Sequence, residues 1–183
     1  MLRQQRVALP RDQRREKARR CARHALRALL ARKVRRVAVY IDYQSELSTQ
    51  PLIHGLIDRG VRVYVPRLIG AANMRMIELR SDTRLQRNRH GIAEPCGRSH
   101  ARPRQLDAIV LPLTGFDLQG RRLGTGGGYY DRFLSDLRGR PKPWRLGYAY
   151  ALQQCASLPA DPWDVPLHAV CTERGLLRFT HSL

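Results

Sequence analysis

One nearly continuous apolar run, LDAIVLPLTGF at residues 106–116, constrains the fold more than any other feature of the sequence. A strand that is apolar on both faces belongs inside a sheet with both faces covered, as in parallel α/β proteins. Helical patterns alternate with further strand-like segments, which is typical of helix–sheet–helix proteins. These segments lie at residues 34–42, 61–68, 74–79, 145–151 and 168–173. The sequence therefore predicts an α/β fold, a three-layer helix–sheet–helix sandwich with a Rossmann-like, mostly parallel sheet.

Three helices are expected to cover this sheet. Residues 12–33 carry apolar side chains at three- and four-residue steps, with arginines on the opposite face. Residues 48–60 form a second candidate, in which Ser48 or Thr49 caps the start, Pro51 occupies the first turn and Gly60 follows the end. A third helix is expected from about Gly128 to Leu137. Residues 80–105 are polar and contain GIAEP, which favours a long surface excursion.

The length and cysteine content favour a single cytoplasmic domain. A chain of 183 residues is long enough for one domain with a full core, and we assign residues 1–183 to it because no linker or repeat divides them. No apolar run reaches the length of a membrane span, and the start is not a secretory signal. The cysteines are far apart and without C-x-x-C spacing, which favours reduced, buried thiols. They are Cys21, Cys96, Cys155 and Cys171.

The formal net charge of +19 leaves two classes of partner open. A basic surface can bind nucleic acid. However, only three of the 34 basic residues are lysines, and a bias of this kind can reflect genome composition. Aromatic residues make up 7% of the chain, and no stacking motif is interleaved with the arginines. Attraction of small anionic ligands is therefore the simpler interpretation, and a basic nucleic-acid-binding α/β protein is the alternative.

A glycine-rich segment, GRRLGTGGGYYDRFL at residues 120–134, is the candidate binding loop. It follows a buried strand, where open α/β sheets bind ligands, and glycines let a phosphate approach the backbone. A helix starting there would aim free N–H groups at the anion, and Arg121 and Arg122 would add charge. The segment is neither a Walker loop nor G-x-G-x-x-G. Taken alone, a glycine cluster is more often a turn than a nucleotide site, and an aspartate at position 131 is more often a first-turn carboxylate facing the helix dipole than a metal ligand.

The longer segment LPLTGFDLQGRRLGTGGGYYDRFL resembles the signature of the 5-formyltetrahydrofolate cyclo-ligase family, also called methenyltetrahydrofolate synthetases. YIDYQSELSTQPLI, GIAEP and LGYAYALQQCASLPADPWDVPLHAVCTE are similar to further parts of that family, so that the likeness spans roughly residues 36–173. The resemblance implies a ligase of one-carbon metabolism. It would cyclise 5-formyltetrahydrofolate to 5,10-methenyltetrahydrofolate with ATP and Mg²⁺, by phosphorylating the formyl oxygen and releasing ADP and phosphate.

The resemblance also implies the site residues. Charge stabilisation is assigned to Arg122 and Tyr129, and Asp131 and Asp164 match magnesium carboxylates. Ile41 and Glu46 match substrate contacts, joined by the segment from Thr125 to Tyr129. Asp117 and Gln153 fit the pattern as ligand contacts or as loop supports. The residues that would surround ATP are Arg122, Leu123, Gly124, Thr125, Gly126, Gly127, Gly128, Tyr129 and Tyr130.

The N-terminus departs from the family pattern. The family begins with a Lys-x-x-Leu-Arg segment that reaches ATP, and this segment would lie upstream of Met1. Either the true start is earlier, or Arg3 and Arg6 replace the segment. We expect a monomer that acts on 5-formyltetrahydrofolate, with or without a polyglutamate tail, and that has no membrane partner. An enzyme of the sugar-phosphate isomerase or CoA-transferase kind has a similar architecture and is a second alternative, but it requires a catalytic base that the sequence does not place.

Overall fold

The computed structural model describes residues 2–70, 73–88, 91–97, 99–124, 126–159, 161 and 164–180. The α-helices are α1 (Leu2–Ala8), α2 (Arg11–Ala31), α3 (Gln50–Ile57) and α4 (Tyr129–Leu134). The strands are β1 (Arg36–Val39), β2 (Arg62–Ile69), β3 (Asn73–Leu79), β4 (Leu85–Arg87), β5 (Ala93–Pro95), β6 (His100–Ala101), β7 (Ala108–Leu111), β8 (Gly115–Phe116), β9 (Arg122–Leu123), β10 (Trp144–Tyr148), β11 (Ala169–Thr172) and β12 (Gly175–Arg178). Short 3₁₀ helices lie at Pro103–Gln105, Ser135–Leu137 and Ala151–Gln153.

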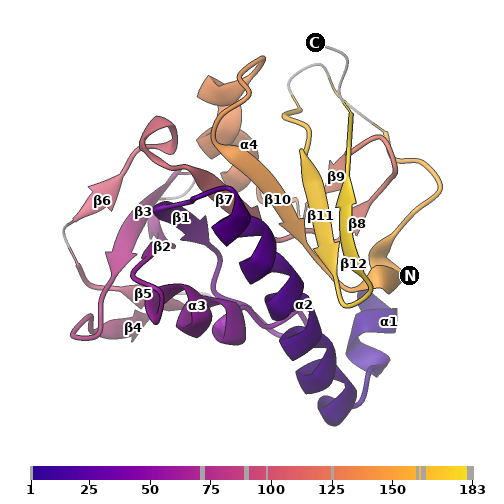
Figure 1. The fold of residues 1–183 in the computed structure, drawn as a ribbon, viewed down its shortest axis with the longest axis horizontal. Helices are drawn as coiled ribbons and strands as arrows, with labels where there is room; N and C mark the ends of the chain where they lie inside the picture. The colour runs from indigo at the N-terminus through magenta and orange to yellow at the C-terminus, as the bar shows by residue number, and fades with distance from the viewer. Residues whose placement is uncertain are drawn as a thin grey trace.

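Eight strands form one central sheet in the order β12-β11-β10-β7-β1-β2-β3-β6 (Figure 1). The five inner strands from β11 to β2 are parallel, and β12, β3 and β6 pair antiparallel at the two edges. The chain moves from β1 outward to β2 and then returns to β7 on the other side of β1. The strand order therefore reverses between β1 and β7, and the crevice beyond their carboxyl ends is where open α/β sheets bind ligands.

Helices α2 and α3 cover one face of the sheet, and α4 lies on the other (Figure 1). Alternation along β1 produces the two cores, because Val37 and Val39 pack beneath α2 and α3 while Ala38 faces the opposite side. All four residues of β7 are buried, as the apolar run in the sequence predicts. The three-layer, mostly parallel α/β arrangement is confirmed.

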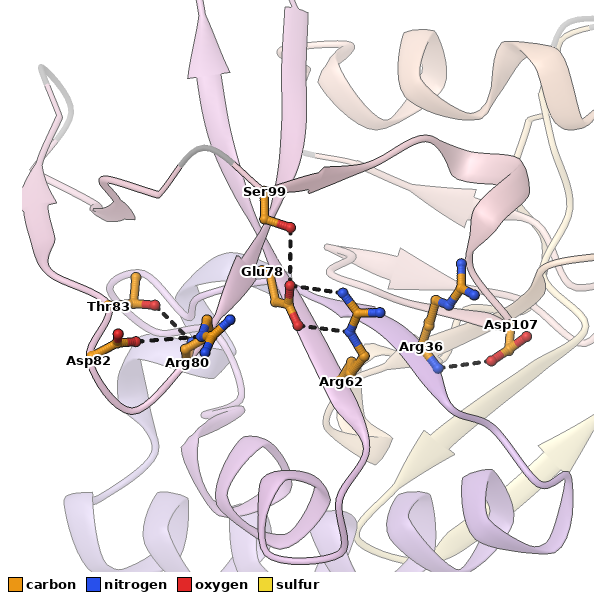
Figure 2. Close-up of polar contacts among 8 residues, drawn as sticks. All are labelled: Arg36, Arg62, Glu78, Arg80, Asp82, Thr83, Ser99 and Asp107. Carbon is orange, nitrogen blue, oxygen red and sulfur yellow. Dashed lines mark hydrogen bonds and ion pairs between the residues drawn. The ribbon is translucent and has the colours of Figure 1, made fainter.

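The amino ends of the strands are joined by a dense set of polar contacts (Figure 2). Arg62 at the start of β2 donates two hydrogen bonds to the Glu78 carboxylate, of 2.8 and 2.9 Å, and Ser99 donates another at 3.0 Å. One carboxylate oxygen of Asp107, just before β7, accepts 2.8 Å hydrogen bonds from the backbone N–H groups of Arg35 and Arg36. These contacts fix the start of β1 against β7 and the start of β2 against β3.

The helix and strand predictions are confirmed in type, with corrections at their edges. Thr49 occupies the N-cap position of α3, but its side chain makes no capping bond; its hydroxyl donates instead to the Tyr40 carbonyl at 2.8 Å. The third helix is shorter than expected, because α4 ends at Leu134 and a 3₁₀ turn follows. The sequence did not predict α1 or the edge strand β12.

The segment at residues 80–105 is more ordered than a surface excursion. Strands β4 and β5 pair as a hairpin, and β6 joins the edge of the main sheet. Glu94 is buried and accepts hydrogen bonds from the Leu68 N–H and from the Asn88 side chain, at 2.9 and 2.7 Å. A buried carboxylate with these partners ties the hairpin to β2.

The cysteine prediction is half correct. All four cysteines are free, and Cys21 and Cys171 are buried, but Cys155 is half-buried and Cys96 is exposed. Within the described ranges, no helix is both long enough and apolar enough to cross a membrane.

Candidate functional site

The loop after β1 forms one side of the crevice at the strand-order reversal. The Tyr40 hydroxyl donates to the Leu47 carbonyl at 2.7 Å, and the Thr49 hydroxyl donates to the Tyr40 carbonyl. These bonds close the loop on itself and fix the backbone around Glu46. Ile41 lies just beyond β1 and packs, half-buried, against the core beneath α2.

Glu46 is a half-buried carboxylate at the bottom of this loop. One of its oxygens accepts a 3.0 Å hydrogen bond from the Tyr43 N–H. Burial raises the pKa of Glu46, and the Tyr43 bond and the positive charge of Arg6 act against that rise. A carboxylate of this kind can accept hydrogen bonds from the N–H groups of a heterocyclic ring.

A β-hairpin after β7 positions Arg122 on the other side of the crevice. Strand β9 pairs with β8, so that Arg122 lies opposite Phe116. The turn between them is fixed by Asp117, which is fully buried and accepts hydrogen bonds of 3.0 Å from the N–H groups of Gln119, Arg121 and Leu158. The sequence placed the glycine loop directly after the buried strand; in the structure, this hairpin comes between them.

Arg122 and Tyr130 leave polar atoms unused in the crevice. The Arg122 side chain is only 7% exposed and forms an ion pair with Asp131. Its Nε and the Tyr130 hydroxyl are both buried, and among the residues with described placement neither has a hydrogen-bond partner. Burial raises the pKa of Tyr130, the charge of Glu46 raises it further and that of Arg122 lowers it.

Arg6 of α1 adds a third unused polar atom. The residue is only 4% exposed, and its Nε is buried without a partner in the described part of the chain. Its terminal nitrogen donates a 3.5 Å hydrogen bond to the Leu113 carbonyl, just after β7. Unpaired buried polar groups cost about 1–3 kcal/mol each, and groups that are kept in spite of this cost are candidates for binding a polar ligand.

The glycine loop runs between these groups and α4. Gly126 and Gly128 have φ values of +92° and +63°, which only glycine adopts readily. Leu123, Gly124, Gly126 and Gly127 are exposed. Gly128, Tyr129 and Tyr130 are half-buried, and Thr125 lies outside the described residues. Because α4 has six residues, its dipole adds little, and any phosphate binding has to come from the loop and its arginines.

Asp164 lines the same hollow as Arg122. Both residues line a hollow of about 280 Å³, together with Gln119, Arg121 and Asp161. Asp164 accepts a 3.0 Å hydrogen bond from the Asp161 N–H and is exposed. We call this space the Arg122 hollow. The segment that contains Asp161 and Asp164 forms one wall of this hollow, and the β8–β9 hairpin forms the other.

The two predicted magnesium carboxylates therefore flank one arginine. Asp131 is ion-paired with Arg122, and Asp164 lines the same hollow as Arg122. Within the described residues no three His, Cys, Asp or Glu side chains gather as a metal site. Mg²⁺ is usually bound in nucleotide sites by one or two carboxylates plus phosphate oxygens and water. Two separated carboxylates close to Arg122 fit that requirement.

Two residues that the sequence left undecided act as supports. Asp117 binds three backbone N–H groups of the hairpin and the segment beyond it. The buried Gln153 amide donates to the carbonyls of Leu113 and Thr114 at 2.6 and 3.1 Å. The sequence did not predict that Arg6 is buried, because one arginine among many at the N-terminus carries no periodic signal. Arg3 bonds Gln44 at the surface.

Comparison with known proteins gives a consistent result. The sequence profile of the 5-formyltetrahydrofolate cyclo-ligase family matches residues 1–173. The chain is 38% identical to the 5-formyltetrahydrofolate cyclo-ligase of Escherichia coli K12 over 176 residues, covering 94% of this chain and 96% of the relative. The mouse enzyme is 31% identical over 76% of this chain and 73% of its own.

Solved structures agree with the sequence matches. The solution NMR structure of the 5,10-methenyltetrahydrofolate synthetase of Aquifex aeolicus superposes with a TM-score of 0.79 at 30% identity, covering 100% of this chain and 92% of that chain. The synthetase of Mycoplasma pneumoniae superposes with a TM-score of 0.74 at 26% identity and covers 94% of each chain.

Proposed function

Because this chain belongs to the 5-formyltetrahydrofolate cyclo-ligase family and is an enzyme of that kind, we propose that it uses ATP to convert 5-formyltetrahydrofolate to 5,10-methenyltetrahydrofolate in the cytoplasm. The observation that carries the proposal is a set of three buried polar atoms without partners in the described residues, namely Arg6 Nε, Arg122 Nε and the Tyr130 hydroxyl. We infer that they serve one site at the strand-order reversal, where Glu46 would bind the pterin and Arg122 the phosphates.

The reaction proceeds by activating a poor leaving group. The formyl oxygen attacks the γ-phosphorus of ATP, the bond from that phosphorus to the bridging oxygen breaks, and ADP leaves. The carbon of the resulting iminium phosphate is then attacked by N10. Loss of the N10 proton and cleavage of the carbon–oxygen bond release inorganic phosphate and leave the methenyl bridge between N5 and N10. The protein's task is to position the two ligands and to stabilise charge.

Arg122 is the residue best placed to stabilise the transferring phosphoryl group. Its guanidinium is nearly buried, so its charge acts through a medium of low polarity, where a preorganised donor stabilises charge more strongly than it does in water. The exposed Gly124, Gly126 and Gly127 leave room for the phosphates at the backbone. Arg6, from the opposite side of the crevice, takes the part of the N-terminal basic segment expected from the family.

Asp131 and Asp164 would hold Mg²⁺ against the nucleotide. Bound there, the ion would neutralise phosphate charge and polarise the γ-phosphoryl group. Asp131 is 41% exposed in spite of its ion pair with Arg122, so a second cation can reach it.

Glu46 and Tyr129 would bind the folate. The carboxylate can accept hydrogen bonds from the pterin N–H groups, and Ile41 provides an apolar wall beside it. The Tyr129 ring lies next to the glycine loop, where it can stack on the substrate. It is already paired with the Arg132 guanidinium, whose carbon lies 5.4 Å from the ring centre.

A near-ultraviolet absorbance assay tests the proposal. Purified protein with 5-formyltetrahydrofolate, Mg²⁺ and ATP is expected to accumulate methenyltetrahydrofolate and to release one phosphate for each product. The matched control omits ATP and should show no absorbance change. If no product appears with ATP, even after the chain is extended at its N-terminus, the proposed function is wrong.

A further inference from the structure

The loop between β1 and α3 contains a second carboxylate, that of Asp42, which closes the loop at its base. One oxygen of Asp42 accepts a hydrogen bond of 3.1 Å from the Ser48 hydroxyl and one of 3.0 Å from the Thr49 N–H group. Asp42 lies shortly beyond the end of β1, and Thr49 directly precedes α3. The Asp42 side chain therefore ties the start of the loop to its end and fixes both against the start of α3.

Between these two ends the backbone makes a tight turn that carries Glu46. The Glu46 N–H donates to the Tyr43 carbonyl at 3.1 Å, and the Tyr43 N–H donates to the Glu46 carboxylate at 3.0 Å. Gln44, within this turn, has a φ of +54°, a left-handed conformation that is uncommon for a residue with a side chain. Such a conformation persists only where the surrounding contacts fix it. The position of Glu46 therefore depends on the closure of the loop at its base.

The charge of Asp42 also acts on Glu46. Burial raises the pKa of Glu46, a backbone hydrogen bond and the positive charge of Arg6 lower it, and the negative charge of Asp42 raises it again. The charge of Glu46 acts in turn on Tyr40, just after β1, and on Tyr130 of α4. Burial raises the pKa of both tyrosines, so they are uncharged at neutral pH. Among the described residues, Asp42 is thus the acid whose charge opposes the ionisation of Glu46.

We propose that Asp42 is a positioning residue for the proposed reaction, which holds the Glu46 carboxylate in place for the folate through its contacts within the loop. The inference rests on the proposed function, since that function assigns the pterin to Glu46. It goes beyond the resemblance, which points to Ile41 and Glu46 but not to Asp42. The hydrogen bonds of Asp42 keep the loop closed, and its charge sets the pH range in which Glu46 is ionised.

Steady-state kinetics of two variants separate the hydrogen bonds of Asp42 from its charge. Asp42→Ala removes both, so that the loop opens at its base. We expect the KM for 5-formyltetrahydrofolate at neutral pH to rise about tenfold, the factor that corresponds to losing hydrogen bonds to a charged group. The kcat and the KM for ATP should stay within about twofold of the wild type, because other elements supply the groups that would bind the phosphates.

Asp42→Asn keeps the shape of the side chain and one acceptor oxygen but removes the charge. Its KM for the folate at neutral pH should change by no more than about threefold. Loss of a neighbouring negative charge lowers the pKa of Glu46, so the rise of kcat/KM with pH should move to lower pH than in the wild type. A residue that only stabilised the loop would not shift this pH profile. Should Asp42→Ala fold poorly, Asp42→Asn still tests the inference.

Asp107→Asn is the matched control. Asp107 also accepts two hydrogen bonds with a single carboxylate oxygen, but at the amino ends of the strands and away from Glu46. This variant should lower the melting temperature while it leaves both KM values and the pH profile unchanged.

Two kinetic results would overturn the inference. One is an Asp42→Ala variant whose KM for the folate is unchanged, or whose KM for ATP rises equally. The other is an Asp42→Asn variant whose pH profile coincides with that of the wild type. Failure of the proposed function is seen separately, as the absence of turnover in the wild type. In that case carbon-13 NMR, with the Glu46 carboxyl signal assigned from Glu46→Gln, decides: a Glu46 titration that does not move to lower pH in Asp42→Asn contradicts the inference.

Discussion

The two ends of the parallel sheet differ in how completely their polar groups are paired. At the amino ends, Glu78 receives two hydrogen bonds from Arg62 and one from Ser99, and a single oxygen of Asp107 accepts two backbone N–H groups (Figure 2). At the carboxyl ends, Arg6, Arg122 and Tyr130 keep buried polar atoms without partners in the ranges the structure describes. Arg62 at one end uses its nitrogens in the fold, whereas Arg6 and Arg122 at the other end keep unused nitrogens, which we propose bind a ligand.

This contrast teaches that charge alone does not locate a site in so basic a protein. The chain has 34 lysines and arginines, and most of them offer no clue to function. Arg6 and Arg122 differ from the other basic residues because each is buried and has a nitrogen without a hydrogen-bond partner in the described residues. Such a nitrogen lowers the stability of the fold unless a ligand binds to it. Substitutions at the carboxyl ends should therefore reduce activity, and substitutions at the amino ends should reduce the melting temperature.

Arg122→Ala should show the largest effect. We expect kcat/KM to fall by at least about 100-fold, as when a preorganised charge donor is removed, while the melting temperature stays the same or rises slightly. Arg62→Ala is the matched control at the amino end and should keep activity within about twofold. Kinetics and thermal unfolding on both variants provide the measurement; equal activity losses would mean that the contrast between the ends is false.

Asp131→Asn should have the next largest effect. The substitution keeps the shape of the side chain but removes the charge that pairs with Arg122 and would bind Mg²⁺. We expect the KM for Mg²⁺·ATP to rise about tenfold or more, with a change in melting temperature of less than about 3 °C. A loss of stability that matches the loss of nucleotide use would instead assign Asp131 a purely structural role.

Glu46→Gln should change the pH dependence of folate use. Because burial raises the pKa of Glu46, the folded protein holds this proton to a higher pH than the unfolded chain does. Ionisation of Glu46 therefore costs stability as pH rises through that pKa, whereas folate binding gains from it. We expect kcat/KM for the folate to rise with pH as Glu46 ionises in the wild type. The Glu46→Gln variant should not show this rise.

The same variant should melt at an equal or higher temperature at neutral pH, because its amide carries no buried charge. The KM for the folate should increase about tenfold. A pH profile that is the same in both proteins would show that Glu46 does not contact the substrate.

Glu78→Gln should have the smallest effect, and only on stability. The Arg62 hydrogen bonds lower the pKa of Glu78, so the carboxylate contributes stability above its unfolded pKa and loses it as pH falls through the lowered value. Because Arg62 is exposed, solvent screens the pair, and the melting temperature should fall by no more than a few degrees. The difference between wild type and variant should vanish in acid, while kcat/KM remains unchanged at neutral pH.

The sequence predicts the elements with strong periodic patterns and misses those without them. The heptad-like spacing from Ala18 to Leu29 defines α2, and the apolar run defines β7, because burial of these side chains determines the local structure. Strand β4 has three exposed residues and no such signal. Strand β6 has two residues and depends on pairing with β3, which is a long-range contact. Local patterns cannot reveal such pairing.

The same division applies to the candidate site. Motif resemblance points to Arg122, Asp131 and Asp164; in the structure Arg122 forms an ion pair with Asp131 and lines one hollow with Asp164. The resemblance does not predict the burial of Arg6, because that burial depends on how α1 packs against residues after β7. The roles of Asp117 and Gln153 as supports also depend on backbone groups far away in the chain.

Asp117 has one further consequence. One carboxylate oxygen accepts hydrogen bonds from the N–H groups of Gln119 and Arg121 in the hairpin turn. The other accepts one from the N–H group of Leu158, in the segment that leads to Asp164. The Arg121 side chain adds a 2.9 Å bond to the Leu158 carbonyl. Asp117 therefore holds the two segments that form the walls of the Arg122 hollow in place before any nucleotide binds. We therefore expect any adjustment on nucleotide binding at the exposed Gly124, Gly126 and Gly127 rather than at the hairpin turn that Asp117 holds.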